Sequence, residues 1–290
     1  MDRFLPCMNL FTLWGLPEHV RAPSLNSPTL LTELRGLGFE AIQGLSAAGT
    51  QEAGLQAFGV AQVHNPTEFD HLAREQQAAG FAATNVIAGF GLETDADRDR
   101  YCDGLLNASV KHGHPIYLET HRGSITQDIR RTLDAVSRFP DLRFTADFSH
   151  WYVGNDLSNG DFAAKLEVLS PVFERVRFVQ GRLSSPTRVQ VALEGPEDRR
   201  YFVEHYRAML KACFGAFLAN SAAEERIPFA PELLPATMNY NGAKIPLDYA
   251  HTERTADGEE VETSDRWQQA MWLMEMARQA FESASAKPKH

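Results

Sequence analysis

A regular alternation of short apolar runs with longer amphipathic segments restricts the fold of this chain more than any other feature of its sequence. Eight runs have the length and apolar character of buried strands, at residues 10–14, 40–45, 60–64, 82–88, 116–119, 143–147, 176–179 and 229–232. Elsewhere, apolar residues recur at helical spacing in residues 28–37, 69–79, 97–111, 125–139, 162–173, 199–214 and 266–281. Strands that alternate with helices in this way predict a parallel sheet.

Two architectures hold eight parallel strands, a closed barrel and an open doubly wound sheet. The open sheet would bind a nucleotide at a glycine-rich first turn, but the first turn here, Trp14-Gly-Leu-Pro-Glu18, has no GxGxxG motif. A barrel also suits a chain of 290 residues, since such barrels have about 250. We therefore expect an α/β protein whose single domain is a (β/α)8 TIM barrel over residues 1–282. Extended loops should follow strands seven and eight, and residues 283–290 should form a disordered tail.

Polar side chains stand at the C-terminal ends of several predicted strands. In a barrel these ends open onto one face, where binding and catalytic sites are built. Three of the side chains are carboxylates, which would repel one another if buried together without a cation. A divalent metal bound through oxygen atoms is the simplest relief. The polar residues are His64 after strand three, Glu119, His121 and Arg122 at strand five, Asp147 and His150 at strand six, Gln180 and Arg182 at strand seven, and Glu232 at strand eight.

Each of these residues also has a purely structural interpretation. Glu119 could cap a helix or form a salt bridge, and His150 could be a packed histidine that donates to a backbone carbonyl. Trp14 and Trp151 are typical of a core or a pocket wall. The joint occurrence of polar residues on four neighbouring strands favours a functional site over these separate explanations.

At these residues the sequence resembles the xylose isomerase-like TIM barrels, the sugar phosphate isomerase/epimerase superfamily that includes endonuclease IV. The resemblance covers nearly the whole chain. The segments that carry it are Glu119-Thr-His-Arg-Gly123, Asp147-Phe-Ser-His-Trp151, Val179-Gln-Gly-Arg182 and Phe229-Ala-Pro-Glu232.

The resemblance implies a metal site formed by Glu119, Asp147, Gln180 and Glu232. Members of the superfamily have a His where this chain has Gln180, and Gln43 and Ile87 also replace a common Glu and a common His. An amide oxygen suits a hard cation better than zinc, so Mn²⁺ or Mg²⁺ is expected rather than Zn²⁺ or Co²⁺.

The resemblance also implies an activity, that of a metal-dependent sugar isomerase or epimerase that moves a proton beside a carbonyl through an enediolate. Glu119 and Glu232 would be the catalytic acid and base. Two alternatives stay open, a non-catalytic barrel that binds a sugar or polyol at an altered metal site, and a polyol dehydratase on the same scaffold. The implied substrate-binding residues are His150, Arg182, His121, Arg122, His64 and Trp14.

Composition restricts the partners of the chain. A net charge of −10 without a basic run disfavours nucleic acid, and no apolar window approaches the 18 residues of a membrane span. The cysteines Cys7, Cys102 and Cys213 are too widely spaced for a metal knuckle and too few for a disulfide framework, which indicates a reducing compartment. We expect a cytoplasmic protein with a small sugar or polyol substrate. The 233–265 loop would either set substrate choice or pair with a second subunit in a homodimer.

Overall fold

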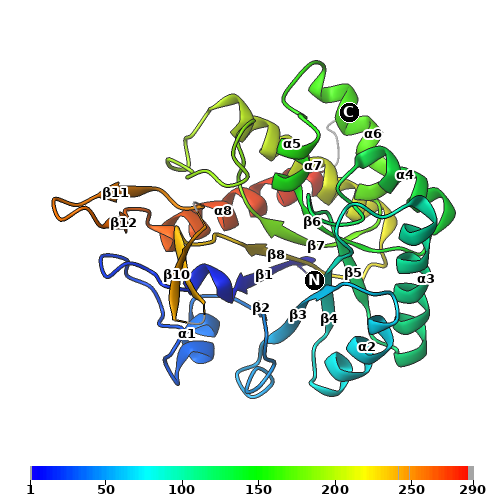
Figure 1. Cartoon of the computed structure of the whole chain (residues 1–290), viewed down its shortest axis with the longest axis horizontal. Coiled ribbons are helices and arrows are strands. Elements are labelled where there is room, and N and C mark those ends of the chain that lie inside the picture. The colour runs from blue at the N-terminus through cyan, green and yellow to red at the C-terminus, as the bar shows by residue number, and fades with distance from the viewer. Residues whose placement is uncertain (1, 241, 248, 287–290) are drawn as a thin grey trace.

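The computed structural model describes residues 2–240, 242–247 and 249–286, which form a closed barrel of eight parallel strands surrounded by helices (Figure 1). The strands follow their sequence order around the barrel, and β8 pairs with β1 to close it. This confirms the predicted (β/α)8 TIM barrel. The strands are β1 (Phe4–Asn9), β2 (Ala41–Gly44), β3 (Gln56–Val63), β4 (Ala83–Ala88), β5 (Ile116–Glu119), β6 (Phe144–Asp147), β7 (Val176–Gly181) and β8 (Ile227–Pro231).

Seven helices occupy the segments in which helical spacing was found. They are α1 (Leu30–Gly36), α2 (Glu68–Ala78), α3 (Asp95–His112), α4 (Ile129–Arg138), α6 (Phe162–Phe173), α7 (Tyr201–Asn220) and α8 (Arg266–Ser285). Their starts follow from the sequence, because side-chain oxygens of Thr94, Asp128, Asp161 and Asp265 cap α3, α4, α6 and α8. A further short helix, α5 (Phe148–Gly154), follows β6 directly and was not predicted. No helix in the described ranges is both long and apolar enough to cross a bilayer.

The first strand lies earlier in the sequence than predicted. Residues 10–14 were expected to form it, but β1 ends at Asn9 and Leu10–Leu13 form the 3-10 helix η1. Asn9 causes the change, because its side-chain oxygen accepts a hydrogen bond from the N–H of Phe11 at 2.9 Å and so caps the turn. The sequence is apolar on both sides of this boundary, so its pattern alone misplaces the strand.

The loop after β8 carries two antiparallel hairpins. They are β9 (Thr237–Tyr240) with β10 (Ala243–Pro246), and β11 (Thr252–Arg254) with β12 (Glu260–Glu262). Figure 1 shows the second hairpin projecting from the body of the barrel. The loop between β7 and α7 contains no helix or strand, so both extended loops are present as predicted. Residues 283–285 of the expected tail instead belong to α8, which continues to Ser285, and residues 287–290 lie outside the described part.

The buried guanidinium of Arg266, at the start of α8, ties the end of the barrel to its beginning. It donates hydrogen bonds to the carbonyl oxygens of Thr12 at 2.5 Å and Trp14 at 2.6 Å, beyond β1. It also donates to the carbonyl of Leu233 at 3.3 Å, beyond β8, and pairs with Glu262 at 2.6 Å. The turn after β1 is thereby fixed against the segment after β8.

Alternation along the strands divides the side chains between two cores. On β1, Leu5 and Cys7 belong to the cluster inside the barrel, whereas the ring of Phe4 packs against Phe214 of α7 and Phe281 of α8. Inside the barrel, the rings of Phe58 and Phe178 lie 5.2 Å apart between centroids. The barrel interior is therefore packed with apolar side chains, and a cavity opens toward the C-terminal ends of the strands.

Gly181, the last residue of β7, allows the close approach of a neighbouring ring. A Cβ atom at this position would lie 2.5 Å from Cζ of the fully buried Phe229. We predict that Gly181→Ala lowers the free energy of unfolding by about 1–3 kcal/mol through overpacking. Denaturant unfolding measures the change.

Gly215→Ala is the matched control for this substitution. Gly215 lies inside α7, and a Cβ atom there would meet nothing within 4 Å. Alanine should therefore raise stability by up to about 1 kcal/mol through helix propensity. Equal effects of the two substitutions would contradict the packing of Phe229 against β7.

Candidate active site

A cavity of about 460 Å³ opens at the C-terminal end of the barrel. Polar residues of β3, β4, β5 and β7 and of the segments after β5, β6, β7 and β8 form one part of its lining, and apolar residues of the loops after β1, β2 and β8 form another. The polar residues are Gln62, Asn85, Glu119, His121, His150, Gln180, Arg182 and Glu232; the apolar ones include Phe11, Trp14, Leu45, Leu234, Pro235, Met238, Leu247 and Tyr249.

The two-residue period of the strands explains why polar residues meet here. On β7, the inward-facing Phe178 is followed at the same side by Gln180 and then by Arg182. On β5, Tyr117 packs on the interior cluster and is followed by Glu119. The inward face of each strand is thus apolar at depth and polar at the mouth, where all parallel strands end together.

A buried ion-pair cluster centred on Arg182 lies at this end of the barrel. Its Nη2 atom lies 3.2 Å from Oδ2 of Asp147 and also donates a hydrogen bond to Oε2 of Glu232. All three residues are less than a tenth exposed. Asp147 is held from its other side by Ser149, whose N–H and hydroxyl donate to Oδ1 at 2.9 and 2.5 Å. Arg182 and Glu232 line the cavity, whereas Asp147 is not among the described residues that line it.

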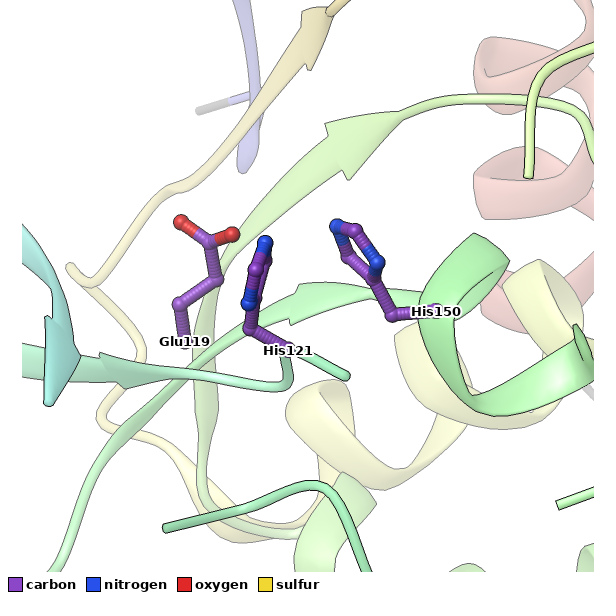
Figure 2. A group of neighbouring side chains, drawn as sticks. All are labelled: Glu119, His121 and His150. Atoms are coloured by element: carbon purple, nitrogen blue, oxygen red, sulfur yellow. The ribbon is translucent and has the colours of Figure 1, made fainter. Parts of the chain in front are cut away.

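A second group comprises Glu119, His121 and His150. Figure 2 shows the three side chains pointing to the same side from β5, the turn after it and α5. One potential ligand atom from each lies within 4.8 Å of the other two, and the two imidazole centroids are 3.9 Å apart. Nδ1 of His121 accepts a hydrogen bond from the N–H of Gly123 at 3.0 Å, and Nδ1 of His150 has no partner among the described residues.

Threonine hydroxyls hold the strand ends that carry these groups. The hydroxyl of Thr120 donates to the carbonyl of Asp147 at 2.9 Å and accepts from the N–H of Asp147 at 3.0 Å, which joins the ends of β5 and β6. The hydroxyl of Thr126 donates to the carbonyl of Glu119 at 2.6 Å and accepts from the N–H of His121 at 3.0 Å. The ends of β5 and β6 are therefore fixed relative to one another.

Burial shifts the pKa values of the cavity residues. Desolvation raises the pKa of Glu119, and the negative charges of Glu232 and Asp147 add to the rise. Desolvation also raises the pKa of Glu232, although Arg182 opposes it. Burial lowers the pKa of His121 to about 4 and that of His150 to about 3, so both imidazoles are neutral near pH 7.

The ion pair keeps its own members charged. Burial alone would raise the pKa of Asp147, but Arg182 and His150 outweigh it and lower the pKa. Burial would likewise lower the pKa of Arg182, yet Asp147 and Glu232 raise it. Arg182 therefore stays positively charged between Asp147 and Glu232.

Several buried polar atoms of the lining have no hydrogen-bond partner in the described residues. They are both side-chain heteroatoms of Asn85, Oε1 of Gln180 and Nε of Arg182. Buried polar groups are nearly always hydrogen-bonded. These atoms are therefore suited to bind the polar groups of a ligand.

The remaining residues predicted to bind substrate have different positions. Trp14 is half-buried and lines the cavity. His64 and Arg122 are exposed and lie outside the lining; the ring of His64 stacks on Phe90 at 4.7 Å between centroids. Arg122 instead lines a neighbouring cavity of about 560 Å³ together with Arg188 and His251.

Asn85 and Tyr249 also line the cavity, but neither was predicted to belong to the site. Asn85 could have been found as a polar residue inside an apolar strand. Tyr249 lies 18 residues beyond β8, at a ring-centroid distance of 5.4 Å from Cζ of Arg182, and no sequence pattern marks it. Its position depends on Gln190, whose side-chain amide donates to the carbonyls of Leu234 at 3.0 Å and Tyr249 at 3.3 Å. Gln190 also accepts from the N–H of Leu234 at 2.9 Å, so it joins the loops after β7 and β8.

Comparisons with solved structures identify the fold. A xylose isomerase-like TIM barrel protein from Mycobacterium smegmatis, in complex with magnesium, matches with a TM-score of 0.53 and 12% identity over 99% of this chain and 98% of that one. The chain has the fold of the xylose isomerase-like TIM barrels. Endonuclease IV from Thermus thermophilus matches with a TM-score of 0.52 and 15% identity over 96% and 99% of the two chains. The probable 3-DHS dehydratase AsbF from Bacillus anthracis, involved in petrobactin synthesis, matches with a TM-score of 0.52 and 12% identity over 78% and 92%.

Comparisons of the sequence itself give no match. No family model matches the chain, and no curated protein matches it either. At 12–15% identity the structural matches establish the fold alone, so the chemistry of the site has to be argued from its own residues.

The residues present offer two different positions for a divalent metal. Of the set implied by the resemblance, Asp147 and Glu232 are already ion-paired with Arg182. The group Glu119, His121 and His150 instead has two neutral imidazoles and a carboxylate within reach of one ion. This donor set fits a divalent transition metal, for which imidazole is a common ligand.

We predict that Zn²⁺, Co²⁺ or Mn²⁺ raises the melting temperature of metal-free protein, since the ion binds only the folded site. At a hundred times its dissociation constant an ion adds about 2.7 kcal/mol, which amounts to several degrees. His121→Ala should abolish the shift because it removes one ligand. His64→Ala, at an exposed histidine outside the cavity, should keep it; a shift that survives His121→Ala would place the ion elsewhere.

Proposed function

We propose that the chain is a metal-dependent isomerase or epimerase of a small, uncharged sugar. The observation that supports this most is the convergence of Glu119 and Glu232 on one cavity, from β5 and from the end of β8, beside two neutral imidazoles. Two buried carboxyl groups facing one ligand provide a base and an acid for proton transfer at carbon.

The proposed reaction begins with removal of a proton from the carbon beside the substrate carbonyl by one carboxylate. The electron pair of the broken C–H bond forms a C=C bond, and the carbonyl oxygen becomes an enediolate oxygen. In an epimerase the second carboxyl group returns a proton to the same carbon, and the carbonyl forms again. In an isomerase it protonates the former carbonyl carbon, while the hydroxyl proton of the first carbon passes to the former carbonyl oxygen and the first carbon becomes the new carbonyl. Arg182 has an unpartnered Nε–H and a permanent charge, which suit it to hold a substrate oxygen.

A divalent ion held by Glu119, His121 and His150 would supply Lewis-acid polarisation of the substrate oxygens. The expectation of Mn²⁺ or Mg²⁺ came from Gln180 as an oxygen ligand. The two imidazoles near Glu119 extend the range to Zn²⁺ and Co²⁺, so the identity of the metal depends on which of the two groups binds it.

The charge and shape of the cavity support the proposed substrate class. Glu119 and Glu232 line the cavity, and its guanidinium, Arg182, is already paired with Glu232 and the buried Asp147, which disfavours an anionic ligand there. A volume of about 460 Å³ lies within the range of small-molecule sites. The aromatic residues Phe11, Trp14 and Tyr249 offer faces for the C–H groups of a sugar, and the unpartnered atoms of Asn85 and Gln180 offer partners for its hydroxyls.

One observation favours the alternative of a barrel that binds without turnover. Arg182 neutralises Glu232 by a direct hydrogen bond, and a carboxylate engaged in this way is a weaker base. A polyol dehydratase would use the same carboxyl groups, with loss of a hydroxyl from the carbon next to the one deprotonated.

We predict that Glu232→Gln slows proton exchange by about 10²–10⁴-fold, the contribution of a general acid or base. The measurement is exchange of the substrate α-proton with deuterated water, by NMR, over a panel of ketoses and aldoses. Binding of the panel member should persist, because the amide keeps the shape of the side chain. Glu260→Gln, on the exposed strand β12, is the control and should exchange like the parent.

Exchange that continues in Glu232→Gln would remove this residue from catalysis. A parent protein that binds a panel member without exchanging or dehydrating it would support the non-catalytic alternative. Loss of water from the ligand, detected as an unsaturated product, would support the dehydratase.

A further inference from the structure

We propose that Arg182 is a built-in cation that fills the position between Asp147 and Glu232, so that a divalent ion binds this protein only at Glu119, His121 and His150. The inference goes beyond the proposed function, since it concerns where positive charge is held and applies equally to an enzyme and to a binding protein. It also departs from the ligand set implied by the resemblance, in which Asp147 and Glu232 hold the metal.

The position of the guanidinium is the first argument. A single nitrogen, Nη2, contacts Oδ2 of Asp147 at 3.2 Å and Oε2 of Glu232. It therefore lies where an ion bridging these two carboxylates would lie. A metal ion binds carboxylate oxygens at about 2.0–2.6 Å, so it could not enter between the same two oxygens unless Arg182 moved away.

The charge balance is the second argument. Asp147 is completely buried and Arg182 is 3% exposed, so neither charge is stabilised by bulk water. Their pairing, with the two hydrogen bonds from Ser149 to Asp147, compensates the loss of hydration. Without Arg182, the buried charge of Asp147 would keep only the two hydrogen bonds from Ser149 and the neutral imidazole of His150, whose Nε2 lies 3.4 Å from Oδ2.

The surroundings of Arg182 are the third argument, because they resist its displacement. The ring of Tyr249 covers the guanidinium, with 5.4 Å between Cζ and the ring centroid. The residue before it, Gly181, lies against the ring of Phe229, which leaves the backbone little freedom to shift. Arg182 is thus enclosed by its two carboxylates, by the loop after β8 and by its own strand.

The first experiment counts Mn²⁺ ions bound to metal-free protein by electron paramagnetic resonance, a readout that does not involve turnover. The proposal expects Glu232→Gln to leave Mn²⁺ affinity within about threefold of the parent, and His121→Ala to lower it at least tenfold. The opposite pattern, with affinity lost in Glu232→Gln and kept in His121→Ala, would overturn the proposal. So would a parent that binds a second Mn²⁺ which Glu232→Gln removes.

The second experiment tests whether removal of Arg182 creates a metal site at Asp147 and Glu232. In the His121→Ala background, Arg182→Met removes the cation and exposes Asp147 and Glu232 to solution ions. We expect Mn²⁺ binding to appear, at least tenfold tighter than in His121→Ala alone, and to disappear again when Glu232→Gln is added. Arg122→Met, which removes an exposed arginine outside the cavity, is the matched control and should create no site.

If the folded protein with both His121→Ala and Arg182→Met binds no Mn²⁺, the idea that Arg182 fills a cation position is contradicted. If this variant does not fold, the comparison of Glu232→Gln with His121→Ala still decides the question, because both keep Arg182. Neither experiment depends on an enzymatic assay. Failure to detect proton exchange would therefore weaken only the isomerase proposal.

Discussion

The burial of three carboxylates at the same end of a closed barrel is the constraint that determines the other interactions in this site. Glu119, Asp147 and Glu232 are brought together by the parallel direction of β5, β6 and β8, and each is less than a tenth exposed. Two different arrangements compensate for the loss of hydration of these carboxylates. Arg182 pairs with Asp147 and Glu232, whereas Glu119 lies beside two imidazoles that each place one nitrogen within reach of a shared cation.

The positive charge near the three carboxylates is thus supplied at two positions, whereas a single metal ion would supply it at one. The Arg182 cluster is permanent, because a guanidinium does not lose its proton in proteins. The Glu119 group is adjustable, since its charge depends on protonation or on an ion from solution. The order in which the residues occur along the strands produces the division: Arg182 stands two residues beyond Gln180, and His121 two residues beyond Glu119, so each strand offers a second inward-facing group.

The sequence predicted the barrel and the end of the barrel at which the polar residues meet, because both follow from periodicity and from the direction of parallel strands. It could not predict which polar groups pair. Arg182 and Gln180 share a face of β7, and only the three-dimensional structure shows that the longer side chain reaches both Asp147 and Glu232.

Other differences have local causes. The first strand was misplaced because Asn9 ends it by capping a turn within an apolar run. Helix α5 was not predicted because no loop separates it from β6. The last residue of β6, Asp147, is also the N-cap of the helix. His64 and Arg122 follow strands like the other polar residues, but beyond the strand ends the backbone turns outward and the two-residue period no longer determines direction.

The hydrogen bonds of Gln190 affect how a ligand enters and leaves the cavity. Its three hydrogen bonds join the loops after β7 and β8, so the cavity-lining part of the β8 loop moves together with the β7 loop behind it. The neighbouring wall, from Phe11 to Trp14, is anchored by Arg266. Entry and departure would then share a single gate on one side of the mouth. The residence time of a bound molecule would depend on how often that gate opens as a unit, whatever the strength of the contacts beneath it.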